Sequence, residues 1–271
     1  MLGSFSDGLK NVYLWPMPRY FLQLSYNGTP YNGWQVQDNT PHTVQQIIQE
    51  KLSIILGEPI GIVGCGRTDT GVHAKEYIAH FDSEKINLHL DESNVVYKLN
   101  KILPYEIATK TICLVADTAN ARFDATCRSY EYFIHQHKNP FLTHNSYYVF
   151  GDLNIDAMNE AATYLLTVTD FTSFSKANTQ TKTNNCTVTE AKWIKQNDTE
   201  FVFKITANRF LHNMVRSIVG TLLQIGKGKM NLEEFKNVIA NKNRSDAGMS
   251  VPAHALYLSH IDYPSTIFSN G

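Results

Sequence analysis

The order of apolar and polar residues along the chain predicts short strands and amphipathic helices. Alternation over 19–26 (RYFLQLSY) is typical of a strand, and apolar residues at helical spacing between Thr43 and Gly57 predict a helix. Thr43 and Gln46 form a candidate capping box at its start, and Gly57 is expected to end it. By the same criteria we expect further strands over 59–63, 77–81, 107–115, 129–135, 187–194, 200–207 and 256–263, and further helices over 91–103, 155–166, 210–225 and 232–240.

Strands and helices follow each other without strict βαβ alternation, which indicates an α+β fold with a mostly antiparallel mixed sheet. The two halves of the chain have a similar pattern, so we expect two related lobes with a central cleft. A cleft between lobes is a common place for a ligand site. We place the lobes at 19–118 and 119–271, after a loose tail at 1–18.

Composition narrows the class of protein only in part. The 271 residues are 43% apolar and 18% charged, as in ordinary globular proteins, and no run approaches the roughly 18 apolar residues of a membrane span. The net charge of −1 neither favours nor excludes nucleic acid, because phosphate contacts depend on local charge. The N-terminus does not read as a signal peptide, and the four cysteines lack CxxC spacing, so we expect free thiols in the cytoplasm and no zinc site.

A glycine-rich loop at 64–74 (GCGRTDTGVHA) concentrates chemistry between two predicted strands. It holds Arg67, Asp69 and His73 among three glycines, and loops between rigid strands often carry catalytic groups. The alternative is a tight turn with a surface Arg–Asp pair. The loop matches neither the Walker pattern nor the dinucleotide fingerprint.

Two other segments carry candidate side chains. In 208–216 (NRFLHNMVR), His212 and Arg216 are four residues apart and would share one helix face, although Arg216 could equally be a solvated surface residue. In 127–132 (CRSYEY), Tyr130 and Tyr132 would share one strand face, where they either pack the core or stack on a displaced base. His73, His80 and His89 are not spaced as a set of metal ligands.

Taken together, these segments resemble the TruA family of tRNA pseudouridine synthases, from about residue 19 to residue 263. The glycine-rich loop is similar to the family's G-R-T-D-x-G-V-H motif, with Thr70 at a position where alanine is common. Segments 26–37 and 122–134 resemble the Y-x-G-x-x-Y-x-G-W-Q and F-x-A-x-x-R-x-Y-x-Y motifs, and 170–175 and 208–220 also match. Ser129 and Glu131 stand where some relatives have arginines.

The resemblance implies a pseudouridine synthase fold with two pseudo-symmetric lobes beside a basic cleft, usually as a homodimer. It implies isomerisation of uridine at positions 38–40 of the tRNA anticodon stem–loop, with no metal or organic cofactor. By motif position, Asp69 matches the catalytic aspartate, and the residues matched around it are Arg67, Tyr130 and Arg216. We assign RNA contacts to Arg67, Arg128, His73 and His212.

This chemistry suits one positioned carboxylate, which can act as a nucleophile or as a base. We expect Arg216 to face Asp69 and pair with it, Tyr130 to stack on the uracil, and Arg67 to act on the RNA backbone or on the vacated base position. Attack at C6 of the base and attack at C1′ of the sugar both stay open. The alternatives are a synthase for another RNA position and a tRNA-binding or RNA-folding protein without activity, while a metal-dependent hydrolase is disfavoured for want of a ligand set.

Overall fold

The structure is a computed structural model that describes residues 17–38, 40, 42–86, 88–176 and 182–268. Residues 1–16 of the expected N-terminal tail lie outside the described residues. None of the described helices is long and apolar enough to cross a membrane. The four cysteines are free thiols, as expected.

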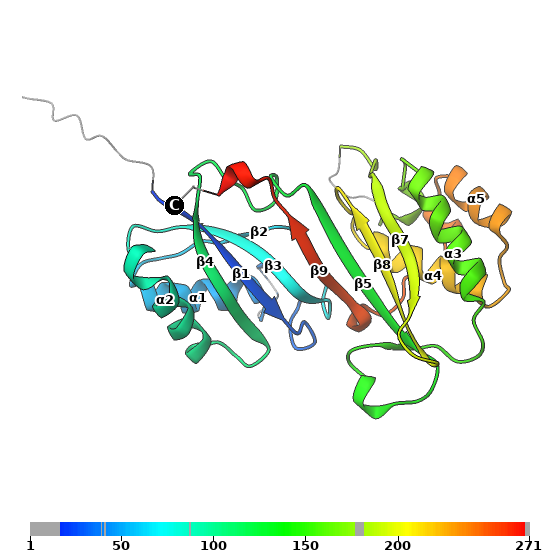
Figure 1. Cartoon of the computed structure of the whole chain (residues 1–271), viewed down its shortest axis with the longest axis horizontal. Coiled ribbons are helices and arrows are strands. Elements are labelled where there is room, and N and C mark those ends of the chain that lie inside the picture. Colours follow the sequence, from blue (N-terminus) through cyan, green and yellow to red (C-terminus); the bar gives the residue numbers. More distant parts are fainter. Residues whose placement is uncertain (1–16, 39, 41, 87, 177–181, 269–271) are drawn as a thin grey trace, which may run out of the picture.

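The described residues form one nine-stranded mixed sheet with helices packed along it, which confirms the α+β prediction (Figure 1). Its main path runs β4-β1-β3-β9-β5-β8-β7, while β2 pairs with β3 and β6 with β5. Within the described residues, only the β3–β9 and β5–β6 pairs are parallel. The strands are β1 Arg19–Tyr26, β2 Val63–Gly64, β3 His73–Asp82, β4 Ile107–Val115, β5 Cys127–His135, β6 Tyr147–Tyr148, β7 Val188–Lys195, β8 Glu200–Ala207 and β9 Leu256–Asp262.

The helices begin and end largely where the local signals predict. The five α-helices among the described residues are α1 Val44–Leu56, α2 Leu88–Ile102, α3 Ile155–Tyr164, α4 Met214–Gly226 and α5 Leu232–Ala240. The Thr43 side chain accepts a hydrogen bond from the Gln46 N–H at the start of α1, and Gly57 ends the helix with a left-handed φ of 67°.

Three elements begin four residues away from their predicted starts, while α2 and β5 begin three and two residues earlier than predicted. The strand expected at 59–63 is only the two-residue β2, and β3 begins at His73, four residues before the predicted 77. The helix predicted from 210 begins at Met214, because Asn213 has a φ of 67° and no α-helix continues through that conformation. His212 therefore lies in the turn before α4 and does not share a helix face with Arg216.

Buried side chains form two hydrophobic cores, one on each side of the sheet's centre. The first joins β1, β3 and β4 with α1 and α2, and the second joins β5, β7 and β8 with α3, α4 and α5 (Figure 1). Tyr130 packs against both cores, and the glycine-rich loop buries Cys65 in the first core and Val72 in the second. The loop is therefore anchored in both halves of the molecule. The predicted lobe boundary at 118/119 stays a prediction.

Candidate active site

The glycine-rich loop rests on a neighbouring loop, residues 27–34, through backbone contacts. The Trp34 N–H donates to the Thr68 carbonyl over 3.2 Å, and the Tyr26 hydroxyl lies 2.8 Å from Thr68 Oγ1. Gly33 has a φ of +82°, and a Cβ there would lie 2.5 Å from the Thr68 carbonyl oxygen. Only glycine permits both this backbone angle and this approach, so the support for the loop depends on position 33.

His73, at the end of the loop, joins three backbone segments. Its Nδ1 accepts from the Gly28 N–H over 3.1 Å, and its Nε2 lies 2.9 Å from the His254 carbonyl and 3.1 Å from the His144 carbonyl. The side chain is 2% exposed, and burial lowers its pKa, which favours the neutral ring that this pattern requires. This burial leaves no ring surface for RNA, so the RNA contact assigned to His73 does not fit the structure.

Asp69 lies at the tip of the loop with both carboxylate oxygens engaged. Its Oδ2 is 3.1 Å from Nη1 of Arg216, and its Oδ1 is 3.1 Å from Nε2 of His212. The carboxylate is 29% exposed, so it is held but still open to solvent. The expected pairing of Arg216 with Asp69 is confirmed.

Arg216 is fixed more firmly than His212. The Arg216 Nε donates to the Val251 carbonyl over 2.7 Å, and the Val251 N–H donates to the Arg216 carbonyl over 3.2 Å. The Arg216 side chain is 21% exposed, against 47% for His212. The guanidinium therefore holds Asp69 from a rigid helix start, while the imidazole approaches it from the solvent side.

Tyr130 supplies an aromatic ring between the two cores. The ring meets Phe210 edge-on, with 5.0 Å between centroids. Burial raises the pKa of Tyr130, and Asp69 is near enough to add to that rise, so the phenol stays protonated. Within the described part of the chain, the Tyr130 hydroxyl has no hydrogen-bond partner.

Arg67 and Arg128 were both assigned to RNA, but their surroundings differ. Arg67 is exposed and makes no hydrogen bond or ion pair with the described residues. Arg128 donates to four carbonyls, those of Arg122 at 2.6 Å, Ala125 at 3.0 Å, Cys65 at 3.0 Å and Asn208 at 3.1 Å. These bonds occupy both terminal nitrogens of Arg128. The side chain therefore joins the chain segments that carry the four carbonyls, and it has few donors left for RNA.

The side chains next to Tyr130 along β5 point to the other face of the sheet. Glu131 lies 2.6 Å from Lys75 and 3.2 Å from Lys204, and Ser129 lies 2.8 Å from Thr206. Successive residues of a strand face opposite sides. The two positions where some relatives have arginines are therefore directed away from the face on which Tyr130 packs.

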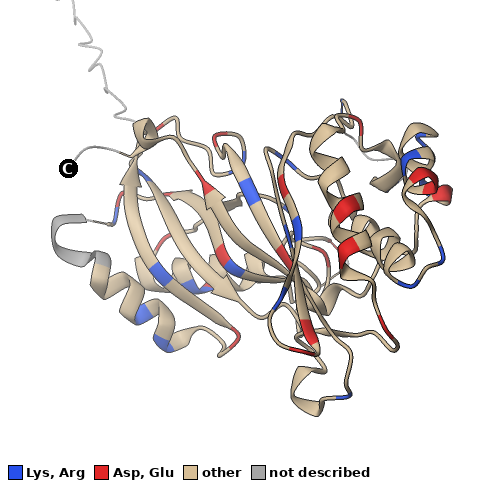
Figure 2. Ribbon diagram, turned by 45° about the vertical axis from the view of Figure 1, so that its right-hand side comes forward, with Lys and Arg blue, Asp and Glu red and all other residues tan. Residues whose placement is uncertain are grey.

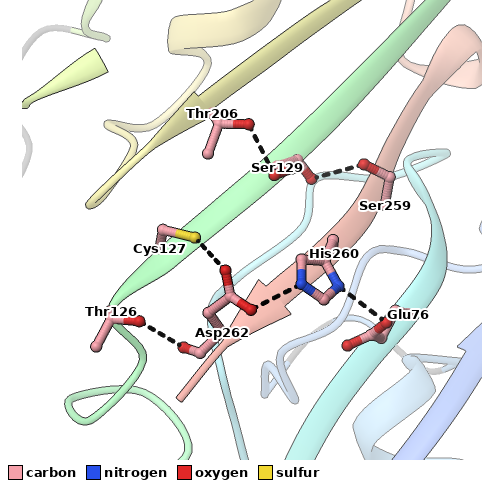
Figure 3. Close-up of polar contacts among 8 residues, drawn as sticks. All are labelled: Glu76, Thr126, Cys127, Ser129, Thr206, Ser259, His260 and Asp262. Carbon is pink, nitrogen blue, oxygen red and sulfur yellow. Dashed lines mark hydrogen bonds and ion pairs between the residues drawn. The ribbon is translucent and has the colours of Figure 1, made fainter. Parts of the chain in front are cut away.

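A polar network on this outer face was not expected from the sequence. The Cys127 thiol lies 2.9 Å from Asp262, the His260 ring lies 2.8 Å from Asp262, and its other nitrogen lies 3.2 Å from Glu76 (Figure 3). Burial lowers the pKa of His260, but the bonds to Asp262 and Glu76 outweigh it and raise that pKa. The network links β3, β5 and β9, which adjoin in space but lie far apart in sequence.

Charged residues are interspersed rather than segregated by sign over the molecule (Figure 2). The expected basic cleft therefore stays a prediction. Among the described residues, no group of three or more His, Cys, Asp or Glu side chains could hold a metal ion.

Comparison with known proteins identifies the family to which the chain is similar. The family model for tRNA pseudouridine synthase matches residues 161–264. A protein of Porphyromonas gingivalis called tRNA pseudouridine synthase A is 47% identical over 93% of this chain and 100% of its own length. Proteins of the same name from Parabacteroides distasonis and Anoxybacillus flavithermus are 49% and 38% identical, over 93% and 91% of this chain and 98% and 99% of their own lengths.

These matches extend over nearly the whole chain and confirm the resemblance drawn from the motifs. The chain belongs to the TruA family of tRNA pseudouridine synthases.

Proposed function

We propose that this chain converts uridine to pseudouridine at positions 38–40 of the tRNA anticodon stem–loop, with Asp69 as the nucleophile. Membership of the family makes it an isomerase that acts on tRNA. The observation that carries the residue assignment is the Asp69 carboxylate, partly exposed and held by Arg216 from the opposite core.

The reaction breaks the N1–C1′ bond, turns the uracil and joins C5 to C1′; C5 gives up its proton and N1 gains one, so the product is an isomer of the substrate. It transfers a group within one nucleotide, so it consumes no oxidant or reductant. A carboxylate can attack either C6 of the base or C1′ of the sugar and leave again at the end. The Arg216 guanidinium orients Oδ2 of Asp69, and Oδ1, which lies beside the more exposed His212, is the oxygen that meets the substrate.

Neighbouring side chains complete the proposed site. Tyr130 stacks on the uracil and supports removal of the C5 proton. Arg67, exposed and without a protein partner in the described structure, acts on the RNA backbone or fills the position that the flipped nucleotide vacates. Flipping costs a few kcal/mol, which phosphate contacts elsewhere offset. His212 contacts RNA once the substrate approaches Asp69.

His73 and Arg128 support the site without touching RNA. Their donors and acceptors are engaged by the backbone of the loops around Asp69. The order of the loop before substrate arrives follows from these bonds, and preorganisation of this kind is what holds a nucleophile in productive geometry.

A homodimer in the cytoplasm is proposed on two grounds. The dimer rests on the family resemblance, and sedimentation of the purified protein tests it. The cytoplasm fits four free thiols, which persist in a reducing compartment.

The experiment that tests the function maps the modified position. A tRNA transcript with uridine at positions 38, 39 and 40 is incubated with the protein, and pseudouridine is located by carbodiimide treatment and reverse transcription. Pseudouridine confined to 38–40 is the expected result. Modification at another position would indicate a synthase specific for that position. Binding of the tRNA without any modification would indicate a tRNA-binding protein without activity.

A further inference from the structure

We propose that Arg122 and Phe123 form a nucleotide-binding platform beside the catalytic loop. The platform loop, residues 120–125, precedes β5. It takes a nucleotide that flanks the target uridine, with the base stacked on Phe123 and a phosphate on Arg122. This inference rests on the proposed function, since a stacking site of this kind has a ligand only if the chain binds RNA.

The platform loop is rigid because its backbone is bonded at nearly every residue. The Asn120 side chain accepts from the N–H groups of Arg122 at 2.9 Å and Phe123 at 3.2 Å, and the Asp124 carboxylate accepts from the Asn120 N–H at 2.7 Å. Ala121 is fully buried, and its N–H donates to His80 Nδ1 over 3.1 Å. The loop thus has one side buried against the protein and one side exposed to solvent.

The exposed side of the platform loop carries an aromatic ring and a cation. Phe123 is 76% exposed, and the Arg122 guanidinium lies 5.4 Å from the centre of its ring. Among the described residues, this guanidinium makes no ion pair. Single exposed apolar side chains are ordinary on protein surfaces. A ring held on a rigid loop, with an unpaired cation over it, is the arrangement that binds unstacked nucleotides.

The position of the loop ties the platform to the catalytic residues. One nitrogen of Arg128, Nη2, donates both to the Arg122 carbonyl at 2.6 Å and to the Cys65 carbonyl at 3.0 Å. The platform loop and the catalytic loop therefore lie side by side at that nitrogen. Arg67 follows Cys65 by two residues and Asp69 follows it by four, so the platform loop adjoins the loop that carries both the exposed Arg67 and Asp69. A nucleotide bound there would be a neighbour of the flipped uridine.

The test measures equilibrium binding of an unmodified tRNA transcript to proteins that carry Asp69→Asn, so that no turnover occurs. Phe123→Ala is expected to raise Kd about 5- to 150-fold, the loss of one base–aromatic stack, without changing the slope of log Kd against log salt. Phe123→Trp keeps a ring and is expected to restore binding. Arg122→Gln is expected to reduce the salt slope by about one.

Phe150→Ala is the matched control. Phe150 is 81% exposed and follows β6, which pairs with the far end of β5 at His135. Eight residues of strand separate His135 from Cys127, roughly 26 Å. Phe150→Ala is therefore expected to leave the Kd for tRNA unchanged. If both alanine variants melt at the same temperature as their parent protein, neither substitution perturbs the fold.

The outcomes separate this inference from the proposed function. If wild type isomerises uridine while Phe123→Ala binds as tightly as its parent, the platform is overturned and the function stands. If Phe123→Ala alters sedimentation but not Kd, the ring contacts protein and the platform is again overturned. If tRNA binds in a manner that depends on Phe123 but wild type forms no pseudouridine, the function fails and the platform stands.

Discussion

His73 offers a direct way to ask how the loop that carries Asp69 is held. The ring accepts from the Gly28 N–H at one nitrogen and lies within hydrogen-bond distance of the His254 and His144 carbonyls at the other. His73→Asn places an oxygen near Nδ1 and can still accept from Gly28, but it cannot reach the two carbonyls. His73→Gln places its amide near Nε2 and can reach them, but it leaves the Gly28 N–H without an acceptor.

The structure sets the size of each effect. A buried polar group left without a partner costs about 1–3 kcal/mol. An N–H without a partner is the less tolerated of the two kinds of group. We therefore expect losses of about 1–2 kcal/mol for His73→Asn and about 2–3 kcal/mol for His73→Gln. Both are large fractions of the roughly 5–15 kcal/mol typical of a folded domain. Turnover should fall in the same order, because His73 follows Asp69 by four residues.

The same residue predicts a dependence of stability on pH. Burial lowers the pKa of His73 below its ordinary 6.5, so in the interval below 6.5 the unfolded chain binds a proton that the folded chain does not. Stability from the neutral ring is complete above 6.5 and is lost as pH falls. His80, His135 and His254 are shifted in the same direction and add to this slope.

Urea unfolding of wild type and both variants, at about pH 5.5 and about pH 8, measures these effects together with single-turnover rates. The variants should be less stable than wild type at both pH values, with the smaller deficit at the lower pH. A His73→Gln protein with wild-type stability and turnover at both values would refute the role given to these bonds.

Three further changes test other parts of the site. Arg216→Lys keeps the charge but cannot hold the Val251 carbonyl and Asp69 together, so the single-turnover rate should fall about 100-fold, and an unchanged rate would remove the orienting role. Tyr130→Phe should lower kcat about 10- to 100-fold with little change in KM if the hydroxyl assists proton removal, whereas wild-type kcat would limit Tyr130 to stacking. His260 has a raised pKa, so its contribution is complete below 6.5 and is lost as pH rises through the folded-state value. His260→Gln should therefore cost more stability at about pH 6 than at about pH 9, by less than about 1 kcal/mol because the pair is exposed, and an equal cost at both would contradict the assignment.

Local structure was predictable wherever neighbouring residues decide it. The strand at 19–26, the helix at 232–240 and the strand at 200–207 have the expected bounds, because side-chain periodicity and caps are local signals. The start of α4 was not predictable from periodicity. The apolar spacing continues back to Phe210, and only the left-handed backbone at Asn213 stops the helix.

Contacts between distant segments needed more than local pattern. Asp69 and Arg216 are 147 residues apart, and their pairing was expected from the ordered motifs of the family rather than from any spacing. Arg128 shows the opposite case. Its partners are four backbone carbonyls. Every residue has a backbone carbonyl, so these contacts leave no signal in the sequence and could not be predicted before the fold was known.

Tritium release from tRNA labelled at C5 of uridine tests the role of Asp69 most directly. Wild type should release tritium as C5 loses its hydrogen, and Asp69→Asn should release none above background while still binding the same tRNA. Release by Asp69→Asn at a rate close to that of wild type would contradict the assignment of Asp69 as the nucleophile.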